Sequence, residues 1–217
     1  MPEKFSEILE LFNVTKPKGY SRKEVEAAKN AAGPMPAVLE QFYLEYGLTD
    51  ELLHLQDNLL LPGRYKALLN DDYTIFFDEN QGVCQAGIKK SEAFMPDPPV
   101  YVRLDHGKWK KSADRVSDFF VAMFGYQASI CLEYSPEEFY FITEEEKGKI
   151  EKLFARRKEK FENWLSEYCI TLYGDNNRGR IAIMEQDGYD IQLSYAANTK
   201  EEYERMAALL QGIGEAI

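Results

Sequence analysis

Residues 73–104 read YTIFFDENQGVCQAGIKKSEAFMPDPPVYVRL, and this stretch carries the strongest fold signal of the chain. Two runs rich in β-branched and aromatic residues, 73–77 and 83–88, flank a polar loop that ends in Gly82, which predicts a hairpin. The third run, VYVRL, follows a pair of prolines, and proline does not fit the interior of a central strand. The stretch therefore predicts three strands joined by defined turns.

Amphipathic helices are predicted on both sides of these strands. The first lies near residues 5–12, and a capping box of Ser21 and Glu24 opens the second. A third helix begins at Pro36 and ends at Gly47. After the strands, Asp114 or Ser112 caps a helix that we expect to end at Gly125.

The ordered motifs of this region resemble the SUKH superfamily, which groups bacterial immunity proteins with fungal regulators of cell-wall synthesis. The resembling residues are Glu79-Asn80-Gln81-Gly82-Val83-Cys84, Gly87-Ile88, Asp97-Pro98-Pro99-Val100, Trp109, residues 35–43, Tyr46-Gly47 and residues 116–120. The resemblance covers residues 33–125, with one departure at Ala86, where members often carry Trp. It implies an α+β fold in which helices cover one face of an antiparallel sheet.

Beyond Gly125 the pattern changes. Residues 139–142 predict a short strand, and a capping box of Thr143 and Glu146 opens a long charged helix that we expect to reach about Tyr168. Three strand-like runs and a helix capped by Thr199 follow; the runs are 169–173, 180–184 and 189–195, the last two joined by Asp187-Gly188. The chain therefore divides into a core, residues 1–125, and a helix–three-strand–helix extension, residues 126–217, packed against it.

Composition excludes several classes of protein. With 26 basic and 37 acidic residues the net charge is −11, so the basic footprint of a nucleic-acid binder is missing. The longest apolar run, residues 119–124, is too short to span a membrane. Three separated cysteines predict neither a disulfide framework nor a zinc site, and they favour reduced thiols in the cytoplasm.

No catalytic constellation stands out. The two histidines, His54 and His106, lie in unrelated contexts, and no phosphate-binding loop or nucleophile elbow occurs. Residues 174–179 partly resemble a calcium-binding loop but lack the spacing of its acidic ligands, so a hairpin loop is the better interpretation. Cys84 inside a strand is typical of a core residue. We expect no enzyme activity, no cofactor and no metal.

The candidate contact residues are polar or aromatic side chains of the sheet and its loops: Tyr73, Glu79, Asn80, Gln81, Asp97 and Trp109. Two of these sites have a structural interpretation that we weigh above the functional one. The polar segment 78–81 can serve turn formation, and Trp109 can be a core side chain or a lid over the sheet edge.

The resemblance implies a cytoplasmic immunity protein that neutralises a cognate bacterial toxin domain, often a nuclease, by stoichiometric occlusion. An acidic surface fits a basic protein toxin as partner, although it can also serve solubility alone. The alternatives are a regulatory protein-interaction module of the cell-wall type and, ranked lower, a small-ligand-binding protein. Oligomeric state is left open.

Overall fold

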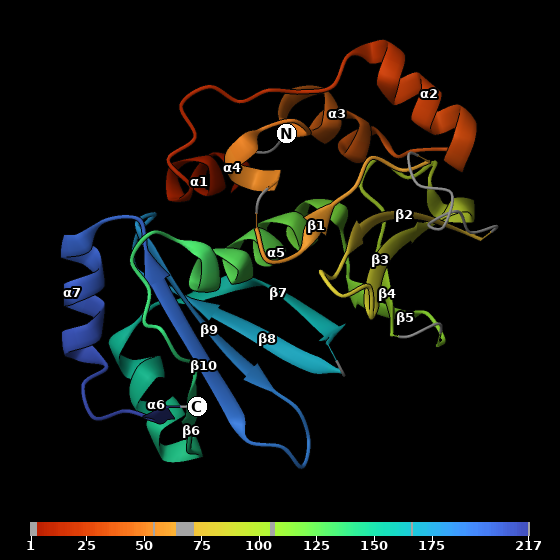
Figure 1. Cartoon of the computed structure of the whole chain (residues 1–217). Helices are drawn as coiled ribbons and strands as arrows, with labels where there is room; N and C mark the ends of the chain where they lie inside the picture. The colour runs from red at the N-terminus through yellow and green to blue at the C-terminus, as the bar shows by residue number, and fades with distance from the viewer. Residues whose placement is uncertain (1–3, 54, 64–71, 105–106, 166, 217) are drawn as a thin grey trace.

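The computed structural model describes residues 4–53, 55–63, 72–104, 107–165 and 167–216. Within these residues the protein is α+β, with seven α-helices and two antiparallel sheets of five and six strands (Figure 1). The expected α+β class and the antiparallel sheet of the first half are confirmed, and the strands expected in the extension belong to a second antiparallel sheet. We call the five-stranded sheet A and the six-stranded sheet B.

The first half of the described chain contains α1 (Lys4–Leu11), α2 (Arg22–Ala32), α3 (Ala37–Tyr46), α4 (Asp50–Leu53), β1 (Asn58–Leu59), β2 (Tyr73–Asp78), β3 (Cys84–Lys89), the short 3-10 helix η2 (Lys90–Glu92), β4 (Val100–Leu104), β5 (Lys110–Ala113) and α5 (Val116–Cys131). The second half contains β6 (Tyr140–Ile142), α6 (Glu144–Leu153), β7 (Arg156–Trp164), β8 (Tyr168–Tyr173), β9 (Gly179–Glu185), β10 (Ile191–Ala197), α7 (Lys200–Leu209) and β11 (Glu215–Ala216).

Sheet A confirms the three strands predicted from residues 73–104. Its order is β1-β2-β3-β4-β5, and every neighbouring pair is antiparallel. Strands β2 and β3 form the expected hairpin, and Gly82 in the loop has φ 75°, a conformation that glycine adopts without steric cost. A bulge between Ile75 and Phe77 turns both Phe76 and Phe77 into the core.

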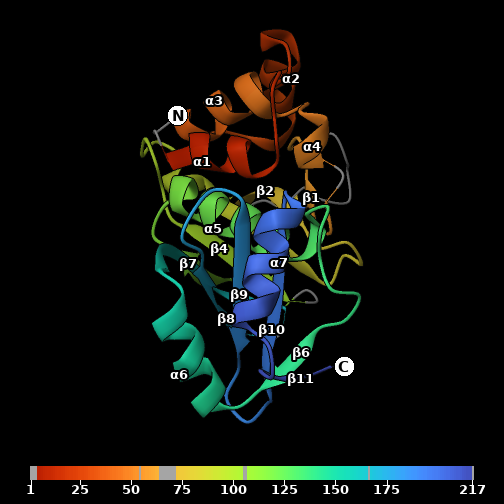
Figure 2. The same cartoon turned by 90° about the vertical axis from the view of Figure 1, so that its left-hand side faces the viewer.

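Sheet B has the order β11-β6-β10-β9-β8-β7, with β7 to β10 forming a continuous antiparallel meander. Alternate residues of its strands enter different hydrophobic clusters. Ala182 and Met184 join the cluster around α5, whereas Ile181 and Ile183 join the cluster of α6 and α7. Sheet B is therefore covered on both faces, and Figure 2 shows α7 in front of β9 and β10.

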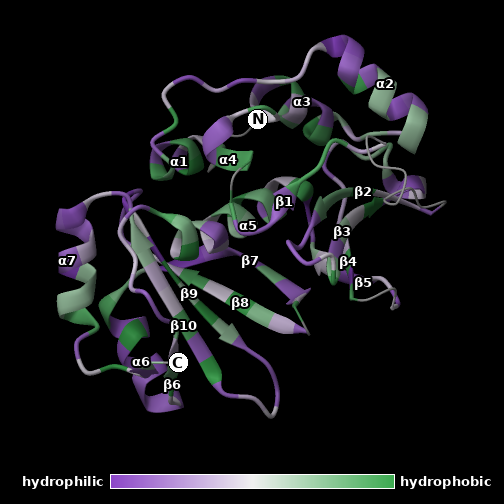
Figure 3. Ribbon diagram, viewed as in Figure 1, coloured by the Kyte–Doolittle hydropathy of each residue, from purple (hydrophilic) through white to green (hydrophobic). Residues whose placement is uncertain are grey.

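Helix α5 lies between the two sheets and is the centre of the larger core. It is strongly apolar, as its green colour in Figure 3 shows, and residues 116–129 along it are buried except for Asp118. Phe119, Phe120 and Phe124 contact aromatic rings from sheet A and from the N-terminal helices. Phe119 also contacts Phe161 and Trp164 of β7, so one helix joins both halves of the chain.

The expected long helix from Thr143 to about Tyr168 is wrong beyond its first ten residues. The Thr143–Glu146 capping box forms, but α6 ends at Leu153 and residues 156–164 are strand β7. This segment is rich in Lys, Arg and Glu, which favour helices, yet pairing with β8 outweighs that weak preference. Phe161 and Trp164 are both fully buried because a register shift follows Glu162. The extension therefore contains one meander strand more than predicted.

Gly125 does not end its helix, because α5 continues to Cys131. A Cβ atom at this position would lie 2.7 Å from Cδ1 of Leu172, so the glycine allows α5 to approach β8 closely. The division of the chain into residues 1–125 and 126–217 falls inside this helix, and it stays a prediction.

Candidate functional site

The outer face of sheet A carries half-exposed aromatic and polar side chains. On the inner face Ala86, Ile88 and Val102 are buried against the core around α5. The alternation of a strand then places Tyr101 and Arg103 on the opposite face, where both are half-buried. In the described part of the chain no α-helix covers this outer face (Figure 1).

Four side chains on this face form what we call the aromatic ridge: Tyr73, Tyr101, Arg103 and Trp109. The rings of Tyr73 and Trp109 stack with centroids 4.2 Å apart and planes 17° apart. Tyr101 meets Tyr73 edge-on, with centroids 5.7 Å apart. The guanidinium carbon of Arg103 lies 5.0 Å from the centroid of the Trp109 ring, within cation–π range. The ridge is therefore pre-packed, because each member contacts another.

Gly87 on β3 makes room for the ridge. A Cβ atom at Gly87 would lie 3.0 Å from Cη2 of Trp109 and 3.3 Å from the carbonyl oxygen of Thr74. The edge of the indole therefore sits on a position without a side chain, so Trp109 is a lid over the sheet that remains half-exposed.

Hydrogen bonds fix both ends of the ridge. Nε and Nη2 of Arg103 donate to Oε1 of Gln85 at 2.9 and 2.7 Å. The Tyr101 hydroxyl donates to Oε1 of Glu92 at 3.1 Å. Burial, the largest cause, and then the Glu92 hydrogen bond raise the pKa of Tyr101, which therefore stays a neutral donor at physiological pH.

Buried carboxylate oxygens flank the ridge. In the described residues Oδ1 of Asp78 and Oε2 of Glu92 are buried without a hydrogen-bond partner. Burial raises the pKa of Asp78, whereas the Gln85 hydrogen bond and the charge of Arg103 act in the opposite direction. Fixed donors, acceptors and rings thus lie side by side on one exposed surface, an arrangement suited to binding.

The six contact residues predicted from the sequence lie in different environments in the structure. Tyr73 and Trp109 belong to the ridge, and Asn80 and Gln81 are exposed at the tip of the β2–β3 hairpin. Whether any of them contacts a partner stays a prediction.

Glu79 does not face solvent as expected, since only 6% of it is exposed. Its Oε2 accepts hydrogen bonds from the backbone N–H groups of Gln81 at 2.9 Å and Val83 at 3.3 Å. The carboxylate therefore closes the hairpin loop from within, in agreement with the turn-forming interpretation of this segment.

Asp97 is half-buried and caps helix α5 from a distance. Its Oδ1 accepts from the backbone N–H of Ser117 at 3.0 Å, and its Oδ2 accepts from the Ser117 hydroxyl. The predicted caps Asp114 and Ser112 are wrong, because the N-cap residue is Arg115 and its side chain makes no capping bond. Both carboxylate oxygens of Asp97 therefore already accept hydrogen bonds within the protein.

Sequence reasoning did not single out Tyr101, Arg103 and Gln85. The signal was present in the VYVRL run, where period-two alternation with Val100 and Val102 facing inward leaves Tyr101 and Arg103 outward. Gln85 lies directly opposite Arg103 in the β3–β4 register.

A separate polar cluster is buried in the core around Asp57. Oδ2 of Asp57 accepts from Nε2 of Gln127 at 2.8 Å and from Nε1 of Trp164 at 3.2 Å, while its backbone N–H donates to Oε1 of Gln127. Burial, the largest cause, raises the pKa of Asp57 to about 6. The nearby thiol of Cys84 is fully buried, and burial raises its pKa to about 12, as for an inert core cysteine.

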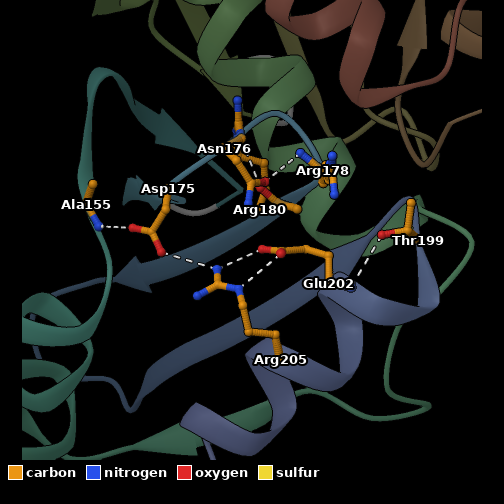
Figure 4. A network of polar contacts seen from close by, with 9 residues as sticks. Ala155, Asp175, Asn176, Arg178, Arg180, Thr199, Glu202 and Arg205 are labelled. Atoms are coloured by element: carbon orange, nitrogen blue, oxygen red, sulfur yellow. Dashed lines mark hydrogen bonds and ion pairs between the residues drawn. The ribbon is translucent and has the colours of Figure 1, made fainter.

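The loop that joins β8 and β9 is a structural connection. Figure 4 shows Asp175 between the backbone N–H of Ala155 and the guanidinium of Arg205, which also binds Glu202. The described residues contain no group of His, Cys, Asp and Glu that could hold a metal ion. His54 and His106 lie outside the described residues.

None of the described helices combines the length and hydropathy that a membrane crossing needs. Comparison of the chain with family models, curated proteins and solved structures finds no match. The resemblance to the SUKH superfamily therefore stays a prediction.

Proposed function

We propose that this chain is a binding protein that holds a protein partner against the aromatic ridge of sheet A. The observation that supports this proposal is the ridge itself, in which one Trp, two Tyr and one Arg pack against each other on a half-exposed sheet face. Trp, Tyr and Arg are the residues that most often dominate binding energy in protein interfaces. Because their side chains are already packed, binding loses little conformational entropy.

The partner that we propose is a cognate toxin domain, neutralised in the cytoplasm by stoichiometric occlusion. This part rests on the SUKH resemblance of residues 33–125, in which sheet A with α3 and α5 would form the SUKH-like core. The net charge of −11 favours a basic domain, with nucleases as the first class to test. Arg103 makes the ridge itself cationic, so the negative charge acts by long-range steering and the ridge by direct contact.

The first test is co-expression with the protein encoded beside this chain. If that neighbour kills cells, co-expression of this chain restores growth, and the two purified proteins form a one-to-one complex. Equal killing with and without this chain contradicts toxin neutralisation. Recovery of many different partners and no toxin favours the regulatory module instead.

The ridge is tested by substitution within the complex. Tyr101→Ala and Arg103→Ala each remove a half-buried ridge side chain, and each is expected to weaken binding by about 2 kcal/mol or more, since hot-spot residues lose that much. Tyr189→Ala is the matched control, because Tyr189 is an exposed aromatic in the β9–β10 loop outside the ridge. Unchanged affinity for both ridge variants, measured by calorimetry on folded protein, removes this face from consideration.

A further inference from the structure

The edges of the two sheets converge in this fold. Strand β5 is the last strand of sheet A and β7 the last of sheet B, and in the described part of the chain each pairs with a single neighbour. The two edge strands contact each other without forming a ladder among the described residues. A side-chain hydrogen bond joins them, because Nδ2 of Asn163 donates to the backbone carbonyl of Lys111 at 2.9 Å.

A cleft of about 520 Å³ lies along these two edges. One wall is the end of β5 with the start of α5, and the other is the middle of β7. Ser112 on the first wall is 7% exposed, and its Oγ has no hydrogen-bond partner among the described residues. On the second wall, β7 has its ladder partner β8 on one side only. Backbone hydrogen-bonding groups on an unpaired edge are a template for an added strand.

The charge of the cleft is balanced, which disfavours a nucleic acid. Its lining has four basic and four acidic side chains: Lys111, Arg115, Lys158, Lys160, Asp114, Asp118, Glu159 and Glu162. Ion pairs join Lys111 to Asp114, Arg115 to Asp118, and Lys160 to Glu162. Lys158 is exposed and has no ion pair within the described ranges, so it is the lining cation available to a ligand.

We propose that this cleft takes an extended segment of the protein partner, which adds a strand to the edge of β7 at residues 158–162 and presents an acidic residue to Lys158. The inference rests on the proposed function, but a partner could bind the ridge without adding a strand to β7. Main-chain bonds to β7 would supply affinity, and the charge opposite Lys158 would supply selectivity.

A second copy of this chain is a poorer occupant. Strand β5 lies beside the edge of β7 and forms the opposite wall of the cleft. The edge of a second folded sheet would collide with β5, whereas a single extended segment would fit between the walls. Two β7 strands paired edge to edge would also bring Lys158 and Lys160 of each copy close together, and like charges opposite each other are destabilising. The same lysines discourage pairing with an arbitrary apolar strand.

Hydrogen–deuterium exchange on the complex tests the strand addition. The probe is the neighbouring-frame protein identified by co-expression, and the readout is exchange of the peptide that covers residues 158–162, followed by mass spectrometry. We expect its edge amides to exchange about tenfold more slowly in the complex, with the 186–190 loop unchanged as control. A tight complex without added protection at 158–162 overturns the strand addition and leaves the ridge proposal standing. Absence of any complex defeats the proposed function and this inference together.

A charge variant tests the predicted acidic contact. Lys158→Glu is expected to weaken the complex about tenfold or more, because it places like charges opposite each other. Lys152→Glu is the matched control, since Lys152 is exposed on α6 and outside the cleft lining. Equal affinities of the two variants contradict the role of Lys158, and a self-association that depends on Lys158 identifies a second copy as occupant.

Discussion

At the scale of single residues, the buried carboxyl group of Asp57 is expected to make stability depend on pH. It is 2% exposed, and its pKa of about 6 lies above the ordinary value of 3.8 because burial disfavours the charged form. The folded protein therefore binds this proton more tightly than the unfolded chain. Its contribution to stability is greatest below pH 4 and is lost as pH rises from about 4 to 6.

The variant Asp57→Asn removes this titration. Between pH 4 and pH 7 the free energy of unfolding of the variant, relative to the native sequence, is expected to shift in favour of the variant by about 2 kcal/mol, since each pKa unit is worth about 1.4 kcal/mol and Asp57 is already partly ionised in the unfolded chain at pH 4. Urea denaturation of both proteins at the two pH values measures the shift, and all other titrating groups cancel in the difference. A constant difference between the two proteins shows that Asp57 keeps an ordinary pKa.

Asp97 also acts at the residue scale, as the cap of α5. Asp97→Ala leaves the backbone N–H of Ser117 without its acceptor, so the free energy of unfolding is expected to fall by about 1–2 kcal/mol. Asp97→Asn retains one acceptor oxygen and should lose less. The comparison is made by urea denaturation at pH 7. Equal stability of the alanine variant and the native chain means that the cap contributes nothing.

At the scale of elements, predictions succeeded where side-chain alternation and turn chemistry agreed. The hairpin at residues 73–88 and the capping boxes at Ser21 and Thr143 form as expected, because all their determinants are local. Residues 156–164 were misassigned because their composition favours a helix while distant β8 supplies the pairing. The sequence named Tyr73 and Trp109 of the ridge, but their stacking depends on the placement of Trp109 over Gly87, which comes from another segment of the chain.

The close contact between α5 and β8 predicts that one substitution destabilises the native chain but stabilises a variant with a smaller neighbour. Gly125→Ala adds a methyl group 2.7 Å from Cδ1 of Leu172, a residue that is 2% exposed, so overpacking is expected to lower the free energy of unfolding by about 1–2 kcal/mol. In a Leu172→Ala background the space is open, and the same change should stabilise by about 0.5–1 kcal/mol through helix propensity. A double-mutant cycle by urea denaturation measures both effects. The same sign in both backgrounds excludes close packing as the reason for the glycine.

At the scale of the whole molecule, α5 joins the two sheets through one hydrophobic cluster. The larger hydrophobic cluster draws on α1, α3, sheet A, α5 and sheet B, from Phe5 to Ala196. Asn198, after β10, donates to the carbonyl oxygen of Leu11 at the end of α1, so the C-terminal sheet also holds the N-terminal helix. The smaller cluster lies within residues 142–210, whereas the larger one needs side chains from both halves of the chain.

Fragments of the chain should therefore fail to fold alone. Residues 1–125 lose the end of α5 and the β7 side chains Phe161 and Trp164, and residues 126–217 lose the helix that covers one face of sheet B. We expect each fragment to give a collapsed amide spectrum by NMR, whereas the full chain unfolds in a single transition seen alike by circular dichroism and by tryptophan fluorescence. The fluorescence comparison is informative because Trp109 reports on sheet A and Trp164 on sheet B. Dispersed spectra from either fragment, or two separate transitions in the full chain, would instead establish two independent domains.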